Sequence, residues 1–200
     1  VQAAKRKVRE FGFAFETDGF VAPDMTRLAQ HITYGGVVEM AYAEEPESII
    51  YLVRADGQLL SMTYRRDEDV VGWSRHILGG SFGSGSAVVE RVAVIPGDNG
   101  AGQVQDSTSR DEVWVLVKRT INSQTTRDIE VFERDFETGQ DQEDAYYADS
   151  LLTYDDTAAT TITGLDHLEG ETVKVWADGS IQADKTVSSG QITLDSSASV

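Results

Sequence analysis

The chain contains no cysteine among its 200 residues. This absence excludes disulfide bonds, iron–sulfur clusters, cysteine-bound zinc and a cysteine nucleophile, but it leaves the compartment open because many extracellular proteins also lack cysteine. The chain also has no apolar run near the ~20 residues that span a bilayer, so no membrane span is expected.

Basic residues are scarce, with 17 Lys and Arg against 34 Asp and Glu and a formal net charge of −17 at pH 7. A surface that neutralises DNA phosphates needs the opposite balance, so tight electrostatic binding to DNA is disfavoured. Hydrophobic residues still make up 40% of the chain, which excludes a wholly disordered acidic polymer. At roughly one domain per 150 residues, the length predicts one large or two small folded units.

Strand patterns fill most of the chain, as period-two alternation or short apolar runs bounded by Gly, Asp and Asn. The sequence therefore predicts a mainly β protein built from antiparallel meanders. In the clearest meander, Ile49 to Arg54 is apolar on both faces and Leu59 to Tyr64 returns after Asp56-Gly57. That dipeptide suits a type I′ turn, which needs a positive φ at both central residues.

One short helix is expected near residues 24–32. Asp24 can act as its N-cap, because apolar residues at helical spacing follow it. These residues are Met25, Leu28, Ala29 and Ile32.

A short internal repeat follows. Val37-Val38-Glu39 matches Val88-Val89-Glu90 at an offset of 51 residues, and Ile50 to Val53 resembles Val113 to Leu116 downstream. A strand at Asp128 to Phe132 would close the second copy. Such periods indicate two propeller blades stacked face to face. The alternative is a sandwich whose two sheets begin with the same triplet.

The composition divides the chain into three parts. Residues 1–133 form the propeller-like β domain, the acidic residues 134–144 form a linker or loop, and residues 145–200 form a small Thr-rich module resembling a β-sandwich or barrel. The polar tail from Asp195 to Val200 is expected to be a frayed end, and the whole chain a piece of a longer protein. The strands expected in the module are Thr160–Thr163, Thr172–Ala177 and Gln191–Leu194, with hairpin turns at Asp178-Gly179 and Ser188-Ser189-Gly190.

No pattern predicts a catalytic, metal or cofactor site. The histidines show no metal-binding spacing and no GxSxG motif is present. Acidic pairs could serve a glycosidase, but we interpret them as solvated. The Gly79–Gly85 run lacks the GK[ST] of a phosphate loop, and the spacing of a possible Ca²⁺ loop fails the EF-hand pattern. The residues considered are His31, His76 and His167; Asp155 with Asp156, Glu44 with Glu45, and Glu169 with Glu171; and Asp98, Asn99, Gly100, Asp106 and Asp111.

A basic cluster near the start, Lys5-Arg6-Lys7 with Arg9, is the one place where the sequence could contact nucleic acid. Against the acidic background such contact would be weak and salt-sensitive. A contact with a protein partner, or a solvated strand, explains the cluster equally well.

Several stretches, taken in order over nearly the whole chain, resemble the tail nozzle proteins of tailed phages, also called tail tubular protein B. The most distinctive is Gly164 to Glu171, which continues through Val173 to Gly179. Trp176 departs from the pattern, because a smaller aliphatic residue is expected there. The other stretches are Val8–Gly12, Tyr51–Gly57 and Asp69–His76.

The resemblance implies a structural virion protein of the phage tail, without enzymatic activity or cofactor. Its copies would form a hexameric ring below the head-to-tail adaptor, in contact with other tail proteins, around the channel through which DNA leaves. Passing DNA would touch it only transiently and non-specifically. Acidic channel walls would let DNA slide, because they repel its phosphates.

A second hypothesis comes from a different class of protein. The chain could be a carbohydrate-binding or glycan-cleaving β protein that acts at the host envelope, with exposed acids and Trp73, Trp114 and Trp176 as its working parts. Trp114 speaks against this reading, because it lies inside the apolar run Val113 to Val117 and is expected in the core.

Overall fold

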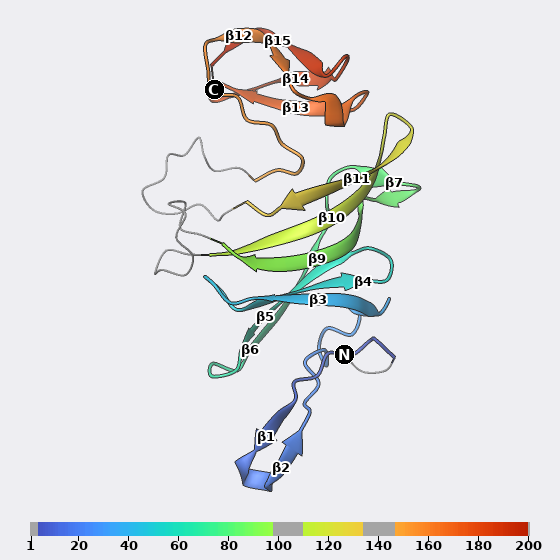
Figure 1. Cartoon of the computed structure of the whole chain (residues 1–200), viewed down its shortest axis with the longest axis vertical. Coiled ribbons are helices and arrows are strands. Elements are labelled where there is room, and N and C mark those ends of the chain that lie inside the picture. Colours follow the sequence, from blue (N-terminus) through green and yellow to red (C-terminus); the bar gives the residue numbers. More distant parts are fainter. Residues whose placement is uncertain (1–3, 98–109, 134–146, 200) are drawn as a thin grey trace. The chain divides into compact units, whose positions relative to one another are not determined.

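The computed structural model describes residues 4–97, 110–133 and 147–199. Strands dominate these residues and pair antiparallel, so the predicted mainly β fold is confirmed. The chain divides into two compact units, described separately below (Figure 1). The N-terminal unit comprises Val1–Leu78, Gly85–Lys118 and Arg127–Phe132, and the C-terminal unit comprises Gly79–Ser84, Arg119–Thr126 and Glu133–Val200.

The N-terminal unit begins with a small hairpin and continues with two sheets, in strand orders β3-β4-β5-β6 and β9-β10-β11. Two very short strands, β7 and β8, connect the sheets along the chain. The elements in this stretch of the chain are β1 (Gly12–Ala14), the 3₁₀ helix η1 (Phe15–Thr17), β2 (Gly19–Val21), β3 (Val37–Ala43), β4 (Ile49–Arg54), β5 (Leu59–Arg65), β6 (Val70–His76), β7 (Ser81–Phe82), β8 (Gly85–Ser86), β9 (Val88–Pro96), β10 (Asp111–Ile121) and β11 (Gln124–Val131). Of these, β7 and the ends of β10 and β11 that join at residues 119–126 belong to the C-terminal unit.

The β3–β6 sheet is buried on both faces, as the apolar run of β4 predicts. On one face Val53 and Leu59 pack against valines of β9 and β10. On the other face Leu52, Leu60 and Met62 pack against the segment before β3. The two sheets thus lie face to face and share one core.

The predicted helix at residues 24–32 is wrong, because this segment consists of successive turns. Its backbone hydrogen bonds join residues three apart, such as Ala29 N–H to the Thr26 carbonyl at 3.0 Å. Side chains from the sheet take carbonyls that an α-helix would use: Trp73 Nε1 donates to the Met25 carbonyl and Arg54 donates to the Ile32 carbonyl. Tertiary contacts therefore override the helical spacing.

The two sheets begin alike, as the repeat predicts. In β3, Val37 pairs with Arg54 and Glu39 with Val53, so Val38 forms a β-bulge. In β9, Val89 pairs with Val117 and Arg91 with Leu116, so Glu90 forms a bulge. Both Val-Val-Glu triplets therefore open a first strand and carry an irregularity there. Face-to-face packing fits propeller blades and the sandwich alternative alike.

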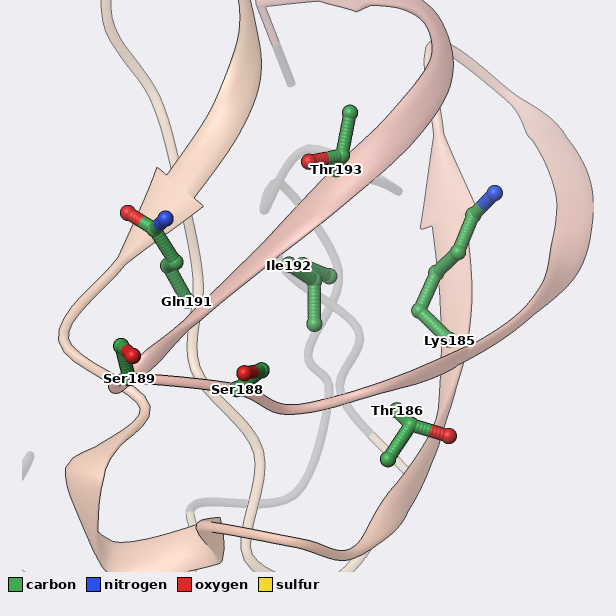
Figure 2. Close-up of a pocket in the computed structure, with 7 residues that line it drawn as sticks. All are labelled: Lys185, Thr186, Ser188, Ser189, Gln191, Ile192 and Thr193. Carbon is green, nitrogen blue, oxygen red and sulfur yellow. The ribbon is translucent and has the colours of Figure 1, made fainter.

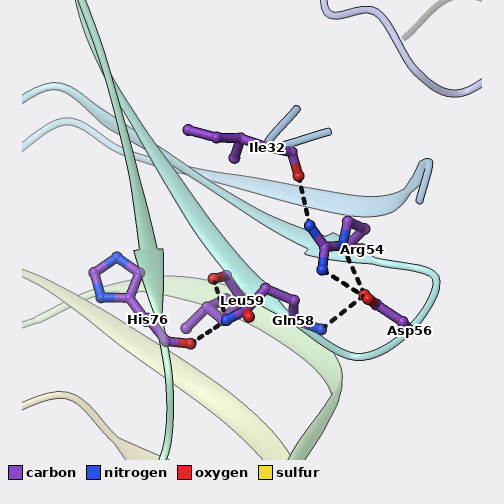
Figure 3. A network of polar contacts seen from close by, with 6 residues as sticks. All are labelled: Ile32, Arg54, Asp56, Gln58, Leu59 and His76. Carbon is purple, nitrogen blue, oxygen red and sulfur yellow. Dashed lines mark hydrogen bonds and ion pairs between the residues drawn. The ribbon is translucent and has the colours of Figure 1, made fainter. Parts of the chain in front are cut away.

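The β4–β5 turn differs from the predicted type I′ turn. Only Gly57 has a positive φ, of 86°, and its N–H donates to the Arg54 carbonyl at 2.8 Å. The arrangement is a type I turn followed by a glycine in the left-handed region. Arg54 clamps the Asp56 carboxylate through two hydrogen bonds of 2.7 Å and reaches the Ile32 carbonyl at 2.8 Å, while Gln58 donates to the His76 carbonyl (Figure 3).

The C-terminal unit contains two two-stranded sheets, β12-β15 and β13-β14, around one apolar core that includes Val175, Val187 and Leu194. Asp178 and Gly179 both have a positive φ and join β13 to β14 as a two-residue hairpin turn. The expected frayed tail is wrong at its start, since β15 continues to Ala198, which is buried. The elements are β12 (Ala159–Thr163), the 3₁₀ helix η3 (Asp166–Leu168), β13 (Thr172–Ala177), β14 (Ser180–Thr186) and β15 (Gln191–Ala198).

Two predicted segments lie outside the described residues. They are the linker at 134–144 and most of the possible Ca²⁺ loop, Asp98 to Asp106. The Gly79–Gly85 run, in contrast, is described and contains β7 and the start of β8. No helix among the described residues is long and apolar enough to cross a membrane.

Candidate functional site

The three histidines occupy unrelated settings. His31 is exposed in the turns before β3, and His167 is exposed in η3. His76 lies in β6 with Nε2 2.8 Å from Ser61 Oγ, and burial lowers the pKa of its imidazole. Within the described part of the chain, no three His, Asp or Glu side chains are grouped so that they could hold a metal ion.

The carboxylates of the Glu169 and Glu171 pair accept backbone N–H groups. The Glu169 carboxylate accepts the N–H groups of Gly190 at 2.8 Å and Ser189 at 3.0 Å, and these bonds lower its pKa. Glu171 accepts the Asn122 N–H at 3.4 Å. An acid kept ionised in this way fixes a hairpin turn and is poorly suited to donate a proton to a glycosidic oxygen.

The other acids considered are also explained by local structure. Asp111, a candidate Ca²⁺ ligand, accepts the backbone N–H groups of Glu44 and Glu45 at 2.6 and 3.2 Å. Asp156 accepts the Thr157 N–H at 2.6 Å, and Asp155 beside it is exposed. These contacts order loops of the fold.

The basic cluster makes contacts within the chain. Lys7 forms an ion pair of 2.8 Å with Asp24, and Arg9 donates to the Ala22 carbonyl at 2.7 Å. The Arg6 guanidinium lies 4.8 Å from the centre of the Tyr34 ring. Since these groups hold the N-terminal segment together, the structure gives the cluster a role in folding.

A surface hollow of about 340 Å³ lies beside β14 and β15 (Figure 2). Its lining is polar, with the hydroxyls of Ser188 and Ser189 and the amide of Gln191 on its rim. Its one charged side chain, Lys185, forms an ion pair with Asp195. The hollow therefore presents no aromatic platform and no pair of acids.

The hairpin of β1 and β2 carries an exposed aromatic cluster that sequence reasoning missed. Phe11 and Phe20 stack with ring centroids 5.0 Å apart, and Phe13 meets the edges of Phe20 and Phe15 at 5.6 and 5.2 Å. Between 40% and 88% of each side chain is exposed. We call Phe11, Phe13, Phe15 and Phe20 the aromatic hairpin.

The alternation Phe11-x-Phe13-x-Phe15 was the signal that could have revealed this hairpin. Its period of two places the three rings on one face of a strand. The strands are only three residues long and interrupted by glycine, so they resemble a loop in sequence.

A second apolar surface covers the side of the β9–β11 sheet that faces away from the shared core. Ile129 is 73% exposed and Val131 44%, and half-buried Trp114 and Leu116 lie on β10 on the same side, alternating with its core valines. We call Ile95, Trp114, Leu116, Ile129 and Val131 the outer face.

The tryptophans divide into two groups. Trp114 is half-buried on the outer face, with Nε1 donating to Glu112 at 2.9 Å, so its predicted place in the core is wrong. Trp73 is half-buried against the core beside the N-terminal segment. Trp176 is 75% exposed on β13 and pairs across the hairpin with Ile181, which is 79% exposed.

Comparison with known protein families gives no matching family, and comparison with curated proteins gives no match. The class that the geometry defines is therefore a two-unit antiparallel β protein with exposed apolar surfaces.

Proposed function

We propose that the chain is a structural, non-enzymatic component of a phage tail nozzle. Its copies would assemble into the ring that surrounds the channel for DNA, below the head-to-tail adaptor. The proposal is carried by the sequence resemblance, and the pair of meanders, each opened by Val-Val-Glu with a bulge and packed face to face on one core, is compatible with it. The propeller-like domain implied by the resemblance calls for such a pair.

The stretches that carry the resemblance have structural tasks, which suits a structural protein. In the most distinctive one, Gly164 and Gly170 have a positive φ, Leu165 is buried and Glu169 holds the β14–β15 turn. Tyr51 to Gly57 supplies a central strand and the turn with the Arg54–Asp56 clamp. These residues hold strands and turns of the fold in place.

The exposed apolar surfaces favour assembly. A monomeric soluble protein seldom exposes large contiguous apolar patches, and such patches mark interaction sites. The aromatic hairpin and the outer face are both of this kind. The net charge of −17 suits a wall past which DNA slides without binding.

The proposal is tested on particles of the phage that encodes the chain. Antibodies raised against the purified chain and labelled with gold should decorate the tail, close to the portal, in electron micrographs. Labelling of the host envelope alone, or particles that contain none of the chain by mass spectrometry, would refute it.

A second candidate function, carbohydrate binding, is favoured by Trp176. Its ring is exposed on the two-stranded β13–β14 sheet, which also carries the Lys174–Asp184 ion pair of 2.6 Å. Sugars stack on exposed aromatic rings flanked by polar groups. This candidate predicts that host-envelope oligosaccharides protect Trp176 from chemical oxidation while leaving Trp73 and Trp114 unaffected. A Trp176→Ala variant should lose all binding by calorimetry, and unchanged binding would exclude this site.

A further inference from the structure

We propose that the aromatic hairpin of one copy docks on the outer face of the β9–β11 sheet of a neighbouring copy. The inference rests on the proposed assembly of the chain with copies of itself. It goes further by naming the two surfaces that meet and the kind of contact they make.

The aromatic hairpin needs a cover. Its strands have three residues each, and an isolated two-stranded hairpin is marginal in water. At 40% to 88% exposure, its four rings present about 500 Å² of apolar area. That is near the upper end of the roughly 300–600 Å² of the largest patch on a typical monomer.

The outer face offers a cover of matching character. Its centre is apolar, with Trp114 and Leu116 on β10 and Ile129 and Val131 on β11. Its rim is charged. An apolar centre with an aromatic anchor and a polar rim is the usual anatomy of a protein interface.

Charge complementarity favours the hairpin as the occupant. The hairpin tip carries two exposed acids, Glu16 and Asp18. One end of the outer face carries three cations, Arg91, Lys118 and Arg127, around the single acid Glu90, which pairs with Lys118 at 3.1 Å and Arg127 at 2.7 Å. On a chain of net charge −17, this local excess of positive charge suits an acidic partner.

A second copy of the chain supplies that partner. If the roughly 500 Å² of the hairpin covers an equal area of the outer face, the contact buries about 1,000 Å² in total, the lower limit for a specific interface. Because the two surfaces differ, the contact is head-to-tail, and each copy keeps one hairpin and one outer face for its other neighbours. Such contacts close into rings when the rotation between copies allows it.

Sedimentation velocity over a concentration series tests the contact. The unmodified chain should form species larger than a dimer as concentration rises. A hairpin variant, Phe15→Ser with Phe20→Ser, and an outer-face variant, Ile129→Glu, should each stay monomeric. Mixed in equal amounts, the two variants should form a dimer and nothing larger, since one intact hairpin meets one intact outer face.

Three further variants guard against a trivial loss of association. Leu28 is 94% exposed but belongs to neither surface, so Leu28→Ser should associate like the unmodified chain. Glu16→Lys and Arg91→Glu should each weaken association at least tenfold, and a double variant that carries both changes should recover it, because the charges are then reversed at every contact.

Three results would overturn the inference: a monomeric unmodified chain at every concentration, a mixture of hairpin and outer-face variants that stays monomeric, or a hairpin variant that associates normally. The nozzle proposal is judged separately by labelling of the particles. Tails that are labelled while these variants associate normally would refute the docking contact alone.

Discussion

Gly57, in the β4–β5 turn, allows the sharpest quantitative test of the fold. A Cβ at this position would lie 2.3 Å from Val88 Cγ1 and 3.1 Å from Val88 Cα, and the φ of 86° already disfavours an L-residue. The left-handed backbone costs about 1–2 kcal/mol, and overpacking costs about 1–3 kcal/mol. Gly57→Ala should therefore destabilise the N-terminal unit by about 3 kcal/mol.

The chain offers a matched control at Gly179, which lies in a hairpin turn with a φ of 75°. Apart from Gly179 itself and its two chain neighbours, no residue has an atom within 4 Å of the place that a methyl group would take. Gly179→Ala should cost its own unit about 1 kcal/mol, the backbone contribution alone. Hydrogen-exchange mass spectrometry in urea reports the two units on separate peptides and so measures each loss.

A double variant separates the two contributions at Gly57. In a Val88→Ala background the nearest clashing atom is gone, so the cost of Gly57→Ala should fall by at least about 1 kcal/mol. Equal losses at Gly57 and Gly179, or a cost at Gly57 that Val88→Ala leaves unchanged, would refute the reasoning from contact geometry.

The remaining predictions concern the core and the response to pH. Leu52→Ala, at a fully buried position of β4, should cost the N-terminal unit about 3 kcal/mol in urea unfolding. Hydrogen bonds from Lys7 and then Thr26 lower the pKa of Asp24 from 3.8 to about 2, so Asp24→Asn should cost about 1 kcal/mol at pH 7, after discounting for solvent, and progressively less as the pH falls below 3.8 and through about 2. Burial lowers the pKa of His76, so the unfolded chain takes up a proton first and stability should fall as pH drops below about 6.5; a His76→Gln variant that kept this part of the pH profile would contradict the assignment.

The meander was predictable because local pattern and tertiary burial agree there. The apolar residues of β4 lie on both faces of a sheet that is covered twice, and glycine falls where the backbone needs a positive φ. The dipeptide Asp56-Gly57 alone does not predict the type of this turn. The Arg54 guanidinium binds the Asp56 carboxylate, and the connection between β4 and β5 is longer than the two residues of a type I′ turn.

Other elements depend on contacts that a sequence does not display. The residues at 24–32 have helical spacing, but Trp73 and Arg54 bind their carbonyls from strands far along the chain. The end of β15 is polar because Asp195 binds Lys185 on β14 of the other sheet, and only Ala198 at its end is buried. Because the only buried side chain in this stretch is that of Ala198, the sequence shows no alternation of apolar and polar residues there that would predict a strand.

Shorter versions of this protein need the residues before Val37, because these residues cover one face of the β3–β6 sheet. Val8, Ala29 and Ile32 cover one face of the first sheet. The Thr33 hydroxyl donates a hydrogen bond of 2.7 Å to the Arg6 carbonyl and so holds this segment together. A version trimmed to start at β3 would expose to solvent the leucine and methionine side chains of this face of the sheet. Such a product should accumulate in inclusion bodies, so a usable boundary lies upstream of Val8.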